Sequence, residues 1–320
     1  PRQKPRYLSC QSNSSRRFFV LHDPIAFDRQ KLDRIDNIET ERFIRYPKAA
    51  SHLALFERLL TTPRPRHYLL TALSGNGKTT LAEYFRAKHP WRINPEGEAA
   101  ILPVLRVTCP PKSSIGSFAD ALLKAMMQKY PKGMVAAEKI DVAINLMRTL
   151  SVRLLFVDEV QHVNVGSVHE RSGMRNTFKM IADQSGASVV LMGIASAVSI
   201  VSKEPQLSRR FKPLVLPKWK ADDTGRSLIQ KIETDLGLKH ASNIAQNVAL
   251  CRKIFAKTNG VLESVVLLLQ DAGIEAIESG KERIDERLID GLDWHSNAHS
   301  YAQAAKMLGC DETEVGRLAA

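Results

Sequence analysis

The chain has 320 residues, of which 44% are hydrophobic and 25% are charged, as in ordinary globular proteins of one large or two smaller domains. No apolar run approaches the roughly 18 residues needed to span a membrane, so we expect no membrane partner. The four cysteines lie far apart without a C-x-x-C pair, which disfavours disulfide and cysteine zinc frameworks and suits a cytoplasmic protein. A net charge of +12 favours a polyanionic partner, nucleic acid before an anionic membrane surface.

The N-terminal segment concentrates this positive charge. Five basic residues precede the first acid, Asp23: Arg2, Lys4, Arg6, Arg16 and Arg17. We interpret residues 1–48 as a basic arm followed by an extension, and the arm could lie along a phosphate backbone. A solvated tail without a partner has the same composition, so both readings stay open.

The middle of the chain alternates between apolar runs and amphipathic helices. Strands are expected at 68–71, 101–107, 153–157, 188–193 and 213–216, with helices at 49–60, 118–126, 140–147 and 174–182. Apolar strands that alternate with helices predict an α/β fold, in which helices cover both faces of a parallel sheet and form a three-layer core at 49–217. Helical periods at 222–236, 244–257 and 261–279 predict a small all-helical domain at 218–293.

The first expected strand leads into a small-residue loop and then a helix. The loop and first helical turn read Ser74-Gly75-Asn76-Gly77-Lys78-Thr79-Thr80. Small residues let backbone N–H groups surround phosphates at a helix N-terminus, which predicts nucleotide binding by these seven residues. Lys78 would reach the β- and γ-phosphates, and the Thr79 hydroxyl would hold Mg²⁺. The pattern departs from G-x-x-x-x-G-K-[ST] at one position, where Ala72 replaces the first glycine.

A second strand ends in two acids, Asp158 and Glu159, after four consecutive apolar residues. Its order after Gly-Lys-Thr is typical of the other half of such a site. Asp158 would hold Mg²⁺ directly or through water, and Glu159 would orient and polarise an attacking water. We therefore expect ATP and Mg²⁺ as cofactors and ATP hydrolysis as the reaction.

These motifs together resemble an AAA+ ATPase with a helical lid and, more narrowly, the TniB/TnsC/MuB group of transposition regulators. The similarity covers about residues 35–290. The matching stretches are Glu41 to Ala49, Ser74 to Thr80, Phe156 to Val163, His169 to Gly173, Leu191 to Ala195, and Gln206 to Phe211 followed by Pro217 to Trp219. The ATPase motifs are generic, whereas His169 to Gly173 and the segment before the P-loop point to TniB.

The resemblance implies an ATP-loaded protein that binds duplex DNA and assembles into rings or helical filaments. It also implies that this assembly directs a DDE transposase to its target, in some members together with a TniQ-type targeting protein. Arg209 or Arg210 would act as an arginine finger on the γ-phosphate of a neighbouring protomer. Core loops would contact DNA phosphates, with Lys112 as the first candidate and Lys129 and Lys132 after it.

Two positions depart from the AAA+ pattern. Where most members place a polar residue at the end of the fourth strand, this chain has Met192 to Ala195 and no polar side chain before Ser196. Where the lid usually has an arginine three residues after a glycine, Gly260 is followed by Glu263. Both departures predict a slow ATPase that acts as a switch and needs a partner for stimulation.

Other functions share part of this pattern. A helicase loader or another DNA-linked AAA+ protein would carry nearly every motif named above. A P-loop kinase of small molecules would not need the Ser208 to Phe211 segment or the positive charge, and a secretion-linked ATPase would be expected to have a membrane span. Residues 294–320 form a predicted helical tail, interpreted as a partner-binding hook, with a helix-turn-helix as the alternative.

Overall fold

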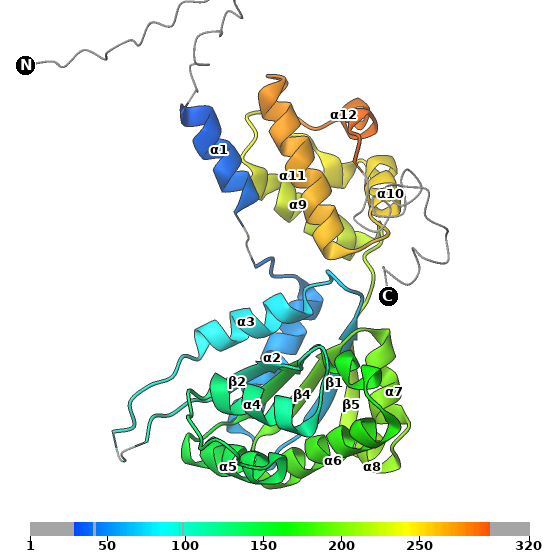
Figure 1. The fold of residues 1–320 in the computed structure, drawn as a ribbon. Coiled ribbons are helices and arrows are strands. Elements are labelled where there is room, and N and C mark those ends of the chain that lie inside the picture. The colour runs from blue at the N-terminus through cyan, green and yellow to red at the C-terminus, as the bar shows by residue number, and fades with distance from the viewer. Residues whose placement is uncertain (1–28, 41–42, 96, 98, 295–320) are drawn as a thin grey trace, which may run out of the picture.

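The computed structural model describes residues 29–40, 43–95, 97 and 99–294. The basic arm at 1–28 and the predicted tail, apart from Trp294 itself, lie outside these residues, so both remain predictions. Figure 1 shows two parts, an α/β core and a group of helices next to it. No helix in the described ranges combines the length and the apolar character that crossing a membrane requires.

The core contains one sheet of five parallel strands in the order β2-β3-β4-β1-β5. The strands are β1 His67–Ala72, β2 Val104–Thr108, β3 Leu154–Asp158, β4 Ser188–Gly193 and β5 Phe211–Leu216. Every residue of β3 and β4 is buried. Strands buried on both faces are typical of a parallel sheet between two helical layers, which confirms the predicted α/β fold.

Alternate residues of each central strand point to opposite faces of the sheet. Leu154 and Phe156 of β3 belong to one hydrophobic cluster, and Leu155 and Val157 belong to the other. Helices α2 Pro47–Thr61 and α3 Lys78–Lys88 cover the first face. The second face is covered by α4 Ile115–Ala125, α5 Ala136–Thr149, α6 Val168–Gln184, α7 Val198–Ser202 and α8 Pro205–Arg210.

Aromatic packing fixes α2 and α3 on their face. Phe56 of α2 lies edge-on to Phe156 of β3, with ring centroids 5.0 Å apart, and edge-on to Phe85 of α3 at 5.5 Å. All three rings are buried. Edge-to-face pairs add about 0.5–1.5 kcal/mol beyond the burial of their area. This cluster therefore positions α3, whose first turn carries the predicted phosphate-binding residues.

The helical part contains α9 Asp223–Leu236, a short 3₁₀ turn at Ile244–Gln246, α10 Val248–Lys257, α11 Leu262–Glu278 and α12 Glu286–Gly291. Two further 3₁₀ turns, Val160–Val165 and Ala195–Ala197, belong to the core. An additional helix, α1 Arg29–Glu39, lies beside α11 and α9 (Figure 1). No helix was predicted there, because the segment is dominated by charged and polar residues and has only three apolar ones, Leu32, Ile35 and Ile38, of which Ile38 alone is buried.

Polar contacts hold α1 against the helical part. Arg34 donates two hydrogen bonds to the Glu282 carboxylate at 2.8 and 2.7 Å, and Gln270 of α11 donates to the Ile38 carbonyl. Hydrogen bonds from Arg34, and to a lesser degree from Lys239, lower the pKa of Glu282 to about 2. The charged extension before residue 49 is thus partly a fixed element of the helical lid.

Two strands begin two or more residues away from their predicted starts. Ile101 forms an isolated antiparallel bridge with Arg92, so β2 begins only at Val104. Strand β5 begins two residues before Pro213, directly after α8. A proline lacks an N–H donor but is tolerated in β5, because β5 is the edge strand of the sheet.

Candidate nucleotide-binding site

The loop between β1 and α3 has the backbone geometry of a phosphate-binding loop. Gly75 and Gly77 have φ angles of 70° and 80°, a left-handed region that glycine adopts without strain. Gly77 precedes the first residue of α3, so free N–H groups of the helix N-terminus open onto the loop. Ala72 is the last residue of β1, pairs with Leu216 and has no left-handed φ. A glycine is therefore not required at that position.

Lys78 lies at the start of α3 with its side chain folded over this loop. Its ammonium group donates to the Leu73 carbonyl at 2.9 Å and to the Ala72 carbonyl at 3.4 Å. Burial lowers the pKa of Lys78, and the nearby carboxylates of Glu159 and Asp158 act in the opposite direction. A buried cation with only carbonyl partners is suited to receive an anionic ligand, because phosphate oxygens would replace weaker acceptors.

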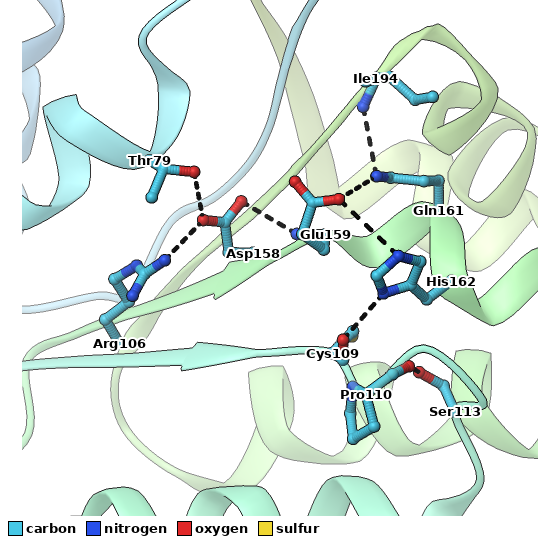
Figure 2. A network of polar contacts seen from close by, with 10 residues as sticks. All are labelled: Thr79, Arg106, Cys109, Pro110, Ser113, Asp158, Glu159, Gln161, His162 and Ile194. Carbon is cyan, nitrogen blue, oxygen red and sulfur yellow. Dashed lines mark hydrogen bonds and ion pairs between the residues drawn. The ribbon is translucent and has the colours of Figure 1, made fainter. Parts of the chain in front are cut away.

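Thr79 and Asp158 meet at the carboxyl end of β3. The Thr79 hydroxyl donates to Asp158 Oδ2 at 2.7 Å, and the Glu159 N–H donates to Asp158 Oδ1 at 2.9 Å (Figure 2). Asp158 is only 1% exposed. Hydroxyl and carboxylate oxygens are the ligands that Mg²⁺ prefers, so this pair fits the predicted metal site.

Arg106 of β2 also contacts Asp158, which the sequence analysis did not anticipate. Its guanidinium donates to Asp158 Oδ2 at 2.9 Å and pairs with Glu83 of α3 at 3.2 Å. Its Nε is buried and has no hydrogen-bond partner. Arg106 is the single charged residue in the strand Val104–Thr108, and a lone charge within an apolar strand was the available signal. It holds the carboxylate in place.

Glu159 follows with a left-handed backbone, at a φ of 55°. This conformation costs a non-glycine residue on the order of 1 kcal/mol and is often found where a side chain must be aimed. Gln161 donates a short hydrogen bond to the Glu159 carboxylate, and Nε2 of His162 lies 3.9 Å from the same group (Figure 2). His162 Nδ1 donates to the carbonyl of Cys109 at 3.0 Å.

Gln161 also contacts the end of β4, where most AAA+ proteins have a polar residue and this chain has none. The N–H of Ile194, just after β4, donates to Gln161 Oε1 at 3.3 Å. A Cβ on Gly193 would collide with this oxygen and with Ala197, so only glycine fits there. Gln161 thus connects the end of β4 to Glu159, in the region where a polar residue of β4 was expected and is absent.

A cavity of about 580 Å³ lies between the loop, Glu159 and the helical lid. All seven predicted nucleotide-binding residues line it, from Ser74 to Thr80. The opposite side is formed by residues of α1 and the segment after it, of α9 and of α11, including Ile38, Tyr46, Leu236 and Val266. A volume of this size, with the phosphate-binding loop on one side and a mixture of apolar and polar side chains on the other, suits a nucleotide.

Asn76 joins the loop to the lid rather than facing the cavity centre. Its buried amide donates to the carbonyls of Leu216 and Pro217 at 3.1 and 2.9 Å and accepts from the Leu262 N–H at 3.2 Å. The Gly75 carbonyl accepts from the Glu263 N–H at 2.9 Å. The position of the lid therefore depends on the conformation of the loop.

The two predicted finger residues have different surroundings. Arg210, at the end of α8, forms an ion pair with Asp183 of α6. Arg209 is exposed and makes no hydrogen bond or ion pair within the described ranges. Neither arginine lines the cavity of its own chain.

The predicted DNA contacts are all exposed, but the structure does not bring them together. Lys112 precedes the N-terminus of α4, whereas Lys129 and Lys132 follow its C-terminal end. An 11-residue helix is about 16 Å long, which is the scale of their separation. Lys112 and His169 lie near Glu170 of α6 and contribute to its lowered pKa, after the larger effect of hydrogen bonds from Ser167.

Comparisons with known proteins agree with this architecture. The chain is similar to the structure of Aeropyrum pernix ORC1 in complex with DNA, with a TM-score of 0.58 and 17% identity over 80% of this chain and 67% of that one. It is also similar to Aeropyrum pernix ORC2 in ADPNP-ADP complexes, with a TM-score of 0.55 and 15% identity over 79% and 70% of the chains. Cdc6p of Pyrobaculum aerophilum gives a TM-score of 0.52 and 14% identity over 86% and 79%.

At these identities the structural likeness shows the fold alone, an α/β fold like that of the ORC1, ORC2 and Cdc6p structures. A search of curated protein sequences gives no significant match. A sequence profile described as "Bacterial TniB protein" matches residues 34–221, which is more than half of the chain and includes the loop, Asp158 and both candidate finger arginines. The chain therefore belongs to the bacterial TniB family.

Proposed function

We propose that this protein is an ATP-dependent, DNA-binding regulator of transposition. It assembles on target duplex DNA as a ring or filament and recruits or activates a DDE transposase, with slow ATP hydrolysis as the switch. The observation that carries the proposal is a cavity lined by the loop with Lys78 and Thr79, in which Thr79 is hydrogen-bonded to Asp158, in a chain of the TniB family. In some members a TniQ-type protein would be a further partner.

In this proposal ATP lies along the loop from Ser74 to Thr80. Lys78 exchanges its two carbonyl acceptors for phosphate oxygens, and Thr79 with Asp158 holds Mg²⁺. Mg²⁺ held there would supply positive charge against the charge that develops on the phosphates. Glu159 orients and polarises the attacking water, once its carboxylate is released from Gln161.

Two features support slow, partner-dependent hydrolysis. Oε2 of the Glu159 carboxylate accepts from Gln161 and lies 3.9 Å from Nε2 of His162, so one of its two oxygens is already engaged. The candidate fingers lie outside the cavity of their own chain, which is consistent with a role toward a neighbouring protomer. Arg209 is the better candidate of the two, because Arg210 already pairs with Asp183.

Support for DNA as the partner comes from charge and from fold relatives. The net charge is +12, and one structurally similar protein, ORC1 of Aeropyrum pernix, is in complex with DNA. Lys112, Lys129, Lys132 and the basic arm would contact phosphates rather than base edges. Such binding should weaken steeply with salt, because each phosphate contact releases counterions.

The proposal is tested by measuring duplex DNA binding with ATP and Mg²⁺ for the wild type, Lys78→Ala and Lys88→Ala. Lys88 is the matched control, since it lies on the same helix but outside the cavity. We expect Lys78→Ala to lose ATP affinity by on the order of 100-fold, together with ATP-dependent DNA binding. Lys88→Ala should retain both. Normal ATP affinity in Lys78→Ala would refute the site.

The transposition role needs its own measurement. Electron microscopy with ATP and duplex DNA should show rings or filaments, and these assemblies should retain a DDE transposase encoded beside the gene. ATP-dependent DNA binding without any transposase contact would favour the alternative of a helicase-loader-like protein.

A further inference from the structure

We infer that Glu263, at the start of α11, is an acidic selectivity residue of the nucleotide site. Its carboxylate disfavours the negative charge of a terminal phosphate and lowers the affinity for ATP relative to ADP. This inference rests on the nucleotide binding proposed above, and it concerns a residue for which that proposal has no role.

The position of Glu263 is set by the loop itself. Its N–H donates to the Gly75 carbonyl at 2.9 Å, and its Oε2 lies over the point where a Cβ on Gly75 would stand. Glu263 lines the cavity together with Lys78 and Thr79. The carboxylate thus lies beside the part of the loop that is built to surround phosphates.

Neighbouring contacts keep this carboxylate in place. Leu262, the preceding residue, is bound through its N–H to the side chain of Asn76. Asn76 is 1% exposed and is held in turn by the carbonyls of Leu216 and Pro217. Because two hydrogen bonds join the backbone at Leu262 and Glu263 to the loop, Glu263 stays beside Gly75 unless the start of α11 separates from the loop.

Acidic residues outnumber basic residues in the wall of the cavity, so the charge of Glu263 should affect the binding of an anionic ligand. Among the described residues that line it, Lys78 is the single Lys or Arg, whereas four are acidic: Glu39, Glu159, Asp235 and Glu263. Like charges disfavour one another more strongly as the ligand charge rises. Removal of one acid should therefore favour a triphosphate more than a diphosphate.

An acid at this position also has a purely structural role, but that role does not account for the place of Glu263 in the cavity wall. An acid in the first turn of a helix interacts favourably with the helix dipole, and Glu263 is such a residue in α11. That effect needs only a solvated carboxylate at the helix end. It does not require contact with Gly75 or a place in the cavity wall.

The test compares nucleotide dissociation constants, measured by titration calorimetry with Mg²⁺, for ADP and a non-hydrolysable ATP analogue. The proteins are the wild type, Glu263→Gln, Glu275→Gln and Lys78→Ala. Glu275 is the matched control, since it is an exposed acid on the same helix outside the cavity. We expect Glu263→Gln to bind the triphosphate about tenfold more tightly and ADP about threefold more tightly. Both gains should shrink at high salt.

The outcomes separate this inference from the proposed function. If the wild type binds nucleotide through Lys78 but Glu263→Gln gains nothing for the triphosphate, the inference is wrong and the proposed function stands. An equal gain for both nucleotides would show an uncharged effect on lid packing and would also overturn it. If neither the wild type nor Glu263→Gln binds nucleotide, the proposed function fails, and the inference fails with it.

Discussion

The two walls of the cavity differ in chemistry and in how the chain builds them. The core wall contains Lys78, which donates to loop carbonyls, and Thr79, which is hydrogen-bonded to Asp158 behind the wall. The lid wall contributes apolar residues of α9 and α11 and the acid Glu263, next to residues from α1. Short motifs at the ends of two strands form the core wall, whereas the lid wall combines segments far apart in the sequence. In the proposed nucleotide site, the core would therefore supply the phosphate and Mg²⁺ ligands, and the lid would adjust the affinity for the nucleotide.

The sharpest way to test the core wall is Glu159→Gln. The substitution keeps the shape of the side chain and its hydrogen bonding but removes the charge that polarises water. We expect ATP hydrolysis to fall by on the order of 1,000-fold, with ATP binding retained. Complexes with DNA should then last longer in ATP, as seen by a dissociation chase. Faster release from DNA would contradict the switch.

A second pair of variants distinguishes the proposed arginine finger, Arg209, from the adjacent Arg210. Arg209→Ala should leave ATP binding by single protomers unchanged but reduce hydrolysis in the assembly by on the order of 100-fold. Sedimentation and hydrolysis with DNA provide the measurement. Arg210→Ala is the matched variant, since it removes an ion pair within the chain and should act mainly on stability. Equal hydrolysis in the wild type and in Arg209→Ala would exclude the trans role for this residue.

The lid wall is tested through the anchor of α1. Arg34→Met removes both hydrogen bonds to Glu282, which is 7% exposed, and should reduce stability by about 2 kcal/mol. The pKa of Glu282 is lowered to about 2 from the model-peptide range near 4.5. Its contribution is therefore present above about pH 4.5 and is lost as the pH falls toward 2.

Denaturant unfolding at pH 7 and at pH 3 measures this effect. The difference between the wild type and Arg34→Met should be smaller at pH 3, where Glu282 is protonated in the unfolded chain. Arg29→Met, in the same helix, is the control, since it is Arg34 and not Arg29 that contacts Glu282. A difference that does not depend on pH would assign the loss to packing alone.

The same contrast explains what the sequence predicts. The strands and the phosphate loop carry their own signals, namely buried apolar runs and the Gly-Lys-Thr motif. In the lid wall, helical periods predict α9 and α11, but not α1, which has one buried residue and is held by Glu282, 248 positions away. Arg106 and Gln161 were also missed as site residues. Their roles come from strand register and from a left-handed turn at Glu159, neither of which follows from residue spacing.

The smallest expected effect concerns Gln161, which the core wall uses to hold Glu159. Gln161→Ala removes the hydrogen bond to the Glu159 carboxylate and the acceptor of the Ile194 N–H. One such bond has a net value of about 1 kcal/mol, so release of Glu159 should raise basal ATP hydrolysis about fivefold without DNA or partner. ATP affinity should stay unchanged, since Gln161 does not line the cavity.

Asn164→Ala provides the matched control for this prediction. Asn164 lies in the same 3₁₀ turn and bonds to the Ser196 carbonyl, but not to Glu159. If both variants raise hydrolysis equally, loosening of the turn is responsible, and Gln161 is not a specific brake. If Gln161→Ala lowers hydrolysis with unchanged ATP affinity, Gln161 positions Glu159 for catalysis. The end of β4 would then act through Gln161 in place of the polar residue that β4 lacks.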